Sequence, residues 1–313
     1  MHKKTKILLC SVGISLMLGG CSGMNSTNNN LEIKEAKETQ TSASSDTFIS
    51  VQEYTGEGYF LANGKETDEI AEQNRDQIEK AAQKYFQEKY QIEVKAHNVV
   101  GARDGATVFL ESEGEPHFYT YAVVPIDVKE KKVLADQIWA DENEVQNAIK
   151  GGLYQMIFKE EFQELDHYLE TLTAEGKVTG KTKEALENTG GNGYMTPYYF
   201  VVVSKNEEAI KPVYDLYLNN HNESIESLRN AYDASKFSAD NLTISIQLYM
   251  QDKKAEPNEE LFNRVTKDLQ GMNNIPKGSY GFYLNDNLIH RETAKGIKDN
   301  SLRRGFPDYI IKE

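Results

Sequence analysis

Histidine and carboxylate side chains are the groups in this sequence with the clearest capacity for acid–base chemistry or metal binding. His97 and His117 fall on predicted strands, and Asp104, Glu111 and Glu113 lie near the turns that join those strands. A shared site would require several of these groups to converge on one point. Because alternate side chains of a strand point to opposite faces, the spacing predicts that they are spread over both faces. We therefore interpret the histidines as core or surface residues and predict no metal site and no catalytic residue, with a His/carboxylate site as the alternative.

Three glutamates before a turn form the second polar pattern. Glu111, Glu113 and Glu115 recur at every second position and so share one face of a strand. This run is typical of a solvated acidic rim. The remaining histidines are also interpreted as core or surface residues: His167, His221 and His290.

The glycine-rich stretch Gly190-Gly191-Asn192-Gly193 has the composition of a phosphate-binding loop. Such loops follow a strand and open a helix. This stretch follows a predicted helix and precedes a predicted strand, so we interpret it as a turn. The patterns G-x-S-x-G, S-x-x-K and H-E-x-x-H and the EF-hand pattern do not occur in the sequence. We predict no cofactor.

Aromatic residues favour packing over carbohydrate recognition. Tyr194, Tyr198 and Tyr199 cluster around Pro197, and tyrosine suits both cores and recognition surfaces because it combines a large ring with a polar tip. We interpret the cluster as core or domain-interface packing. Trp139 is the only tryptophan, which disfavours an aromatic platform for glycans.

The first twenty-one residues predict the location of the protein. Lys3, Lys4 and Lys6 precede an apolar run, Ile7 to Leu18, that is too short to span a bilayer core, which needs ~20 residues. This arrangement is typical of a secretory signal peptide. The run ends in Leu18-Gly19-Gly20-Cys21, which is similar to the lipobox of bacterial lipoproteins, where the cysteine is lipidated on its sulfur and becomes the first residue of the mature chain. We expect residues 1–20 to be a signal peptide and Cys21 to anchor the protein to the extracytoplasmic face of the cell membrane.

Cysteine use and charge exclude several kinds of chemistry and partner. Cys10 would be lost with the signal peptide and Cys21 used by the lipid, so the mature chain would have no disulfide, thiolate nucleophile or cysteine metal ligand. Loss of the three lysines changes the net charge from −14 to −17. Such acidity argues against nucleic acid and against an anionic membrane surface as ligands. Residues 22–50 are polar and predict a disordered tether.

Hydrophobic periodicity predicts an α+β protein with two domains. Residues 51–140 read as a helix, beginning near Thr67, followed by an antiparallel meander of about four strands. Residues 141–313 read as a mixed α/β domain, which starts with a long helical region capped by Asp141. Gly151-Gly152 in that region predicts a kink or a close-packing point. The other predicted helices cover residues 182–188, 207–218, 224–232 and 257–269, the other predicted strands cover 195–203, 242–250 and 280–284, and residues 292–307 read as a polar loop.

Several stretches resemble one known family. They are the lipobox, His97 to Ala102, Pro116 to Asp127, Gly152 to Tyr154, and Gly190 to Pro197. They look like those of lipoproteins from low-GC Gram-positive bacteria that are grouped as a domain of unknown function, number 1672. The resemblance covers the chain beyond the tether. It implies an extracytoplasmic location and brings no activity or catalytic residue with it.

These observations favour a non-catalytic lipoprotein that binds a protein or another component of the cell envelope. A first alternative is the solute-binding lipoprotein of a transporter, although such receptors show alternating strand–helix units around parallel sheets, unlike the early hairpins here. A second is an envelope hydrolase with a scattered acid/histidine site. Three or more titratable groups in one deep pocket would favour the enzyme, and a deep interdomain cleft would favour the receptor.

Overall fold

The computed structural model describes residues 47–313. The predicted signal peptide, the lipidated Cys21 and the tether up to residue 46 lie outside the described residues. The described part of the chain forms eight α-helices and thirteen β-strands in antiparallel and mixed sheets, so the predicted α+β fold is confirmed. None of its helices is both long and apolar enough to cross a membrane.

The first sheet is the predicted antiparallel meander. Its strands are β2 (Val94–Ala102), β3 (Gly105–Ser112), β4 (Tyr119–Asp127) and β5 (Lys132–Val133), in that spatial order. All neighbouring pairs are antiparallel. Because short turns join consecutive strands, local pairing suffices to build the sheet.

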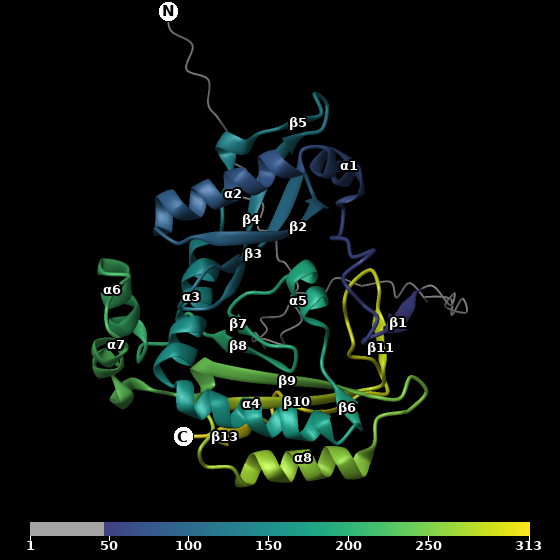
Figure 1. Cartoon of the computed structure of the whole chain (residues 1–313), viewed down its shortest axis with the longest axis vertical. Helices are drawn as coiled ribbons and strands as arrows, with labels where there is room; N and C mark the ends of the chain where they lie inside the picture. Colours follow the sequence, from purple (N-terminus) through teal and green to yellow (C-terminus); the bar gives the residue numbers. More distant parts are fainter. Residues whose placement is uncertain (1–46) are drawn as a thin grey trace, which may run out of the picture. The chain divides into compact units, whose positions relative to one another are not determined.

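Two helices pack against this sheet where the sequence predicts one. They are α1 (Lys65–Gln73) and α2 (Arg75–Tyr90), and both contact β2 (Figure 1). Thr67, the predicted N-cap, lies inside the first turn of α1, and its buried hydroxyl donates to the Ala102 carbonyl at 2.7 Å. Asn74 separates the helices, and its side-chain amide donates to the Ile70 carbonyl at 2.8 Å.

A helix that contacts strands of both main sheets follows the meander. It is α3 (Glu142–Ile157), and the Asp141 side chain caps it by accepting from the backbone amides of Asn143 and Glu144, as predicted. Phe158 separates α3 from α4 (Lys159–Ala174). Gly151-Gly152 lies inside α3 as a close-packing point, since a Cβ on Gly152 would approach the His117 carbonyl oxygen to 2.6 Å. Helix α3 contacts both β4 and β8.

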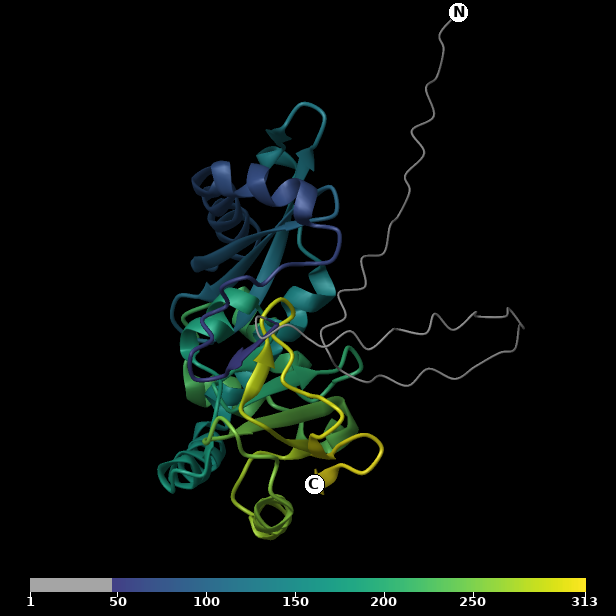
Figure 2. The same cartoon turned by 90° about the vertical axis from the view of Figure 1, so that its right-hand side faces the viewer.

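The second sheet mixes parallel and antiparallel pairing. Its main strands, in spatial order, are β12 (Leu302–Arg304), β10 (Gly278–Asn285), β9 (Leu242–Met250), β8 (Tyr199–Val203) and β7 (Tyr194–Met195). Only the β9–β10 pair is parallel among the pairs of this sheet in residues 47–313, and α8 (Glu259–Gly271) makes the connection between those two strands. Figure 2 shows α8 end-on, on the side of this sheet away from the meander. Two short strands, β6 (Val178–Thr179) and β13 (Ile310–Lys312), pair with β9 and β10.

The remaining elements correct two boundaries of the prediction. Strand β1 (Phe48–Ser50) pairs with β11 (Leu288–His290), so the last three residues of the predicted tether form a strand. Strand β12 lies within the predicted polar loop. Three further helices complete the described chain: α5 (Lys183–Thr189), α6 (Lys211–Asn219) and α7 (Ile225–Ala231).

One hydrophobic cluster contains residues of both main sheets. Val108 and Leu110 of β3 belong to it, as do Ile244 of β9 and Phe282 of β10. Helix α3 contributes Leu153, which is fully buried. The core therefore runs without interruption past Asp141, and the division into two domains there stays a prediction.

Candidate functional site

The Glu111 carboxylate on β3 gathers three side-chain donors. The imidazole Nε2 atoms of His97 and His117 lie 2.7 Å from Oε2 and Oε1 of this carboxylate, respectively. The Tyr119 hydroxyl donates to Oε1 at 3.1 Å. Because an ionised carboxylate only accepts hydrogen bonds, both rings must carry a proton on Nε2. We name these four residues the Glu111 cluster.

A β-bulge brings His97 to Glu111. Ala96 pairs with Leu110 and Asn98 pairs with Phe109, so His97 is an extra residue in β2 without a partner in β3. A bulge re-aims a side chain and interrupts the alternation of the strand. The second histidine, His117, lies before β4 begins and is not bound by strand alternation either. The prediction that these groups are spread over both faces is therefore wrong for His97, Glu111 and His117.

Helix α5 adds a carboxylate that the sequence did not single out. The Glu187 Oε2 atom lies 3.7 Å from His97 Nδ1, and the other oxygen is 3.1 Å from the Lys183 ammonium. Thr182 caps this helix by accepting from the Ala185 amide at 3.0 Å. The helix then docks on β2, because the Asn98 side chain donates to a carbonyl at the end of α5, that of Asn188, at 2.8 Å.

The cluster is shielded from solvent, but not closed. The side chain of His97 is 5% exposed and that of Glu111 is 14% exposed, whereas His117 is 31% exposed. Burial raises the pKa of Glu111, but the hydrogen bonds from the two histidines and from Tyr119 outweigh burial and hold that pKa below its ordinary value. Burial also raises the pKa of Tyr119, so its hydroxyl stays a donor. His117 is thus the more exposed of the two imidazoles that donate to an ionised carboxylate.

The other predicted polar residues do not join the cluster. Asp104, Glu113 and Glu115 are exposed, so the interpretation as a solvated rim holds for the two glutamates but is wrong for Glu111. His167 is exposed on α4. The remaining histidines contact aromatic rings elsewhere: His221 packs on Tyr217, and His290 packs on Phe48.

The glycine-rich stretch is the predicted helix-to-strand turn, and it supports the cluster. Gly190 follows α5 with a φ of 77°, and a Cβ there would approach the Phe109 ring to 2.3 Å. The amide and carbonyl of Gly193 exchange hydrogen bonds with those of Tyr119 at 2.9 and 2.8 Å. This pairing places β7 beside the start of β4, where the Tyr194 ring meets His117 edge-on with ring centres 6.0 Å apart.

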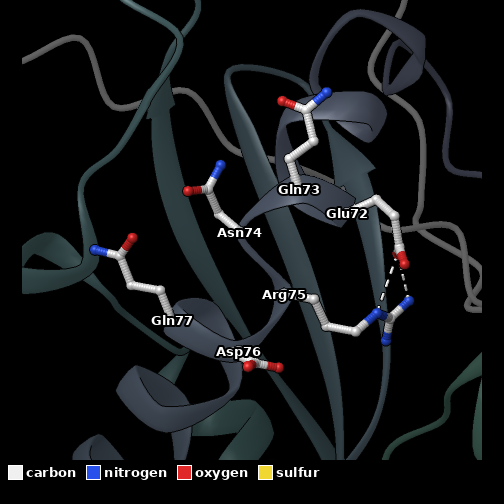
Figure 3. Close-up of a pocket in the computed structure, with 6 residues that line it drawn as sticks. All are labelled: Glu72, Gln73, Asn74, Arg75, Asp76 and Gln77. Carbon is white, nitrogen blue, oxygen red and sulfur yellow. Dashed lines mark hydrogen bonds and ion pairs between the residues drawn. The ribbon is translucent and has the colours of Figure 1, made fainter.

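Two surface hollows lie outside the cluster. One, of about 360 Å³, surrounds the break between α1 and α2 and is lined by Glu72 to Gln77 (Figure 3). Its only ion pair among the residues drawn joins Arg75 to Glu72, and the amide side chains diverge from one another. The other, of about 460 Å³, lies between Phe48 and the loop around Lys298. Neither hollow includes a residue of the Glu111 cluster, so these hollows do not supply the deep pocket that would favour an enzyme.

The described residues include one group that could hold a metal ion. One ligand atom from each of His97, Glu111 and Glu187 lies within 4.8 Å of the others. Imidazole nitrogen and carboxylate oxygen are the ligands of many zinc and other divalent transition-metal sites. The sequence pattern marked His97 and Glu111 as candidate ligands. It did not mark Glu187, which lies ninety residues after His97 and belongs to no recognisable motif.

Comparisons with known proteins agree with this architecture. The fold is similar to that in the crystal structure of a DUF1672 family protein from Staphylococcus aureus, with a TM-score of 0.67 and 20% sequence identity over 86% of this chain and 100% of that chain. No curated protein matches the chain. The sequence profile of the family described as "Protein of unknown function (DUF1672)" matches residues 41–312. The chain therefore belongs to the DUF1672 family.

Proposed function

We propose that the protein is a non-catalytic binding protein of the cell envelope, anchored through a lipid on Cys21 to the extracytoplasmic face of the membrane. The anchor is supported by the basic residues before the short apolar run and by the Leu18-Gly19-Gly20-Cys21 ending. The net charge supports a cationic or neutral partner in preference to nucleic acid.

The Glu111 cluster is the ligand site in this proposal. The observation that carries it is the convergence of His97, His117 and Tyr119 on one shielded carboxylate. Stability does not require such a network, because well-packed apolar residues often replace buried ionic groups without loss of stability. Since His117 is partly exposed, a ligand has access to the cluster. A polar network that is costly to bury and reachable from solvent favours a binding role.

Cross-linking of the lipidated protein in intact membranes tests this proposal. Glu111→Gln keeps the size of the side chain and removes its charge, and Glu113→Gln does the same at the exposed neighbour two residues along. We expect the parent and Glu113→Gln to give the same cross-linked envelope component, and Glu111→Gln to lose at least about tenfold of it, equivalent to ~1.4 kcal/mol of binding. Equal yields from all three proteins, with the fold intact by circular dichroism, would contradict the assignment of the site.

A second candidate function is an envelope hydrolase. It is favoured by the same convergence, since a carboxylate that holds a histidine is a common arrangement for general acid–base catalysis. His117, as the more exposed of the two rings, would then transfer the proton, and Glu111 would orient it. Turnover of ester, phosphoester or peptide substrates by the parent, abolished in His117→Ala and retained in His167→Ala, would establish this function in place of the first.

A further inference from the structure

The lone pairs around His97 are arranged for a cation. His97 must donate from Nε2, because the Glu111 carboxylate 2.7 Å away can only accept. In the neutral ring, the remaining nitrogen, Nδ1, then presents a lone pair. This lone pair faces the Glu187 Oε2 atom across 3.7 Å, a distance longer than a hydrogen bond. In the neutral ring two electron-rich atoms thus face each other at a shielded position, and a cation between them, whether a proton or a metal ion, would turn this repulsion into attraction.

The spacing suits an ion with short bonds to nitrogen and oxygen. Zinc binds imidazole nitrogen and carboxylate oxygen at about 2.0–2.1 Å, which places two tetrahedral ligands roughly 3.3 Å apart. The separation of 3.7 Å between His97 Nδ1 and Glu187 Oε2 therefore needs to close by only a few tenths of an ångström. Glu111 has an oxygen within 4.8 Å of a ring nitrogen of His97 and of an oxygen of Glu187, and its closest ring nitrogen is Nε2, at 2.7 Å.

The surroundings of His97 resemble those of a metal ligand. A ligating histidine usually donates its other ring N–H to a carboxylate or carbonyl, which fixes the ring and its tautomer. Glu111 does this for His97, and it is itself held by His117 and Tyr119. The His97 side chain is 95% buried, so the ring has little freedom to turn away. The other Glu187 oxygen pairs with the exposed Lys183 ammonium at 3.1 Å.

We propose that His97 and Glu187 bind a divalent first-row transition-metal ion, with Glu111 as the carboxylate that positions the His97 ring. The inference rests on the proposed function, in which this cluster is the ligand site, and it adds the chemical class of the ligand. The imidazole nitrogen selects zinc and its neighbours over magnesium and calcium, which prefer oxygen ligands. Water or a donor group of the envelope partner would fill the coordination positions of the ion that the protein does not occupy.

Titration calorimetry with zinc chloride tests the site directly. The full chain, purified in mild detergent, carries Cys10→Ser and Cys21→Ser so that no thiolate competes for the ion. We expect one zinc ion per chain and at least about tenfold weaker binding in His97→Gln, Glu187→Gln and Glu111→Gln. The matched control is Glu184→Gln, an exposed glutamate of the same helix, which should bind as the parent does. Calcium should bind the parent at least roughly a hundredfold more weakly than zinc.

Circular dichroism of each variant shows whether it folds. If the parent shows no saturable zinc binding, or if folded Glu187→Gln binds as tightly as Glu184→Gln, the metal site is overturned. A parent that cross-links its envelope component without binding zinc would overturn the metal site and leave the proposed function standing. Stoichiometric zinc binding with the expected variant profile, in a protein that cross-links nothing, would support the metal site and contradict the proposed function.

Discussion

At the scale of single residues, the Glu111 carboxylate is the best-connected polar group of the site. Two imidazoles and a phenol donate to it, and its own side chain is largely shielded. A carboxylate in such a place is stable only while its donors remain, because an unsatisfied buried charge costs several kcal/mol. Loss of either the carboxylate or its donors should therefore destabilise the fold.

We expect Glu111→Gln to lower the free energy of unfolding by about 1–3 kcal/mol, because the amide nitrogen of glutamine would face N–H or O–H donors. Glu113→Gln, at an exposed position, should stay within ~0.5 kcal/mol of the parent. Urea unfolding at pH 7 with a metal chelator present measures both. Equal stability of the two variants would show that the three hydrogen bonds contribute nothing net.

Lys181 provides a pH test at the same scale. Its ammonium lies 3.3 Å from the Ala294 carbonyl oxygen, and burial lowers its pKa from 10.5 to about 8. Between these two pH values the unfolded chain holds the proton that the folded chain has released, so stability rises as the pH rises through this window. Below pH 8 the buried charge destabilises the fold.

Lys181→Met should therefore raise the free energy of unfolding at pH 7 by about 1–2 kcal/mol, and this gain should shrink as the pH approaches 10. The control is Lys177→Met, at an exposed position four residues earlier. Unfolding by urea at pH 7, 8.5 and 10 gives the comparison. A gain that does not change with pH would assign the effect to packing instead of charge.

At the scale of elements, the turn between β2 and β3 places different demands on its two central residues, Asp104 and Gly105. Arg103-Asp104-Gly105 is typical of a hairpin turn, in which glycine readily adopts a positive φ. The structure places the positive φ, of 56°, on Asp104 instead. Gly105 is required for another reason, since a Cβ there would approach the Val124 carbonyl oxygen of β4 to 2.8 Å.

Gly105→Val should consequently destabilise the protein by about 1–3 kcal/mol, because the side chain would push β3 away from β4. Asp104→Gly should change stability by less than about 1 kcal/mol, since glycine tolerates the left-handed conformation but loses more entropy on folding. Chemical denaturation of both variants gives the two values. A larger loss in Asp104→Gly than in Gly105→Val would reverse this assignment.

The same comparison shows which elements can be predicted. The strand Leu242–Met250 is predicted with its observed bounds, because its alternation is long and regular. The cap at Asp141 is also predicted, since capping depends on residues a few positions apart, whereas the cap predicted at Thr67 is wrong because α1 begins at Lys65. Strands β12 and β13 are missed, because each has three residues and depends on pairing with β10.

At the scale of the whole molecule, as described for residues 47–313, helix α3 connects the two main sheets. It contacts β4 of the meander and β8 of the mixed sheet. The close approach at Gly152, where a Cβ would lie 2.6 Å from the His117 carbonyl oxygen, shows how tightly the helix packs beside the Glu111 cluster. Packing at this point therefore affects both the core and the site.

Gly152→Ala should lower the free energy of unfolding by about 1–3 kcal/mol, despite the better helix propensity of alanine, because the backbone oxygen cannot move aside. Gly271→Ala is the matched control, because it lies at the end of α8 with nothing within 4 Å of the added Cβ, and it should be neutral or stabilising. Thermal unfolding distinguishes them. A neutral Gly152→Ala would show that α3 can shift without cost.

The proposed anchor is tested on the intact chain in cells. Cys21→Ala removes the sulfur that would carry the lipid, so the protein should move from the membrane fraction to the soluble fraction, because stable anchoring depends on the acyl chains. Immunoblots of fractions washed at high salt measure the distribution. Retention of Cys21→Ala in the membrane fraction would require a different anchor.

The sequence by itself determined the α+β class, the meander, most helix starts and the residues of the family resemblance. These features depend on hydrophobic periodicity and on contacts between residues close in the sequence, so they can be predicted from the sequence alone. The sequence also predicts the lipid anchor, which lies outside the described residues. It supplied His97, His117 and Glu111 as candidates, but not their convergence.

Only the tertiary structure decided that convergence. The bulge at His97 depends on the pairing of β2 with β3, and a one-residue change of register reverses the face to which a side chain points. Glu187 reaches His97 because α5 docks on β2 through the Asn98–Asn188 hydrogen bond, a contact between residues ninety positions apart. Local sequence patterns do not predict how α5 docks on β2. The docked arrangement is stabilised by contacts between residues that are far apart in the sequence.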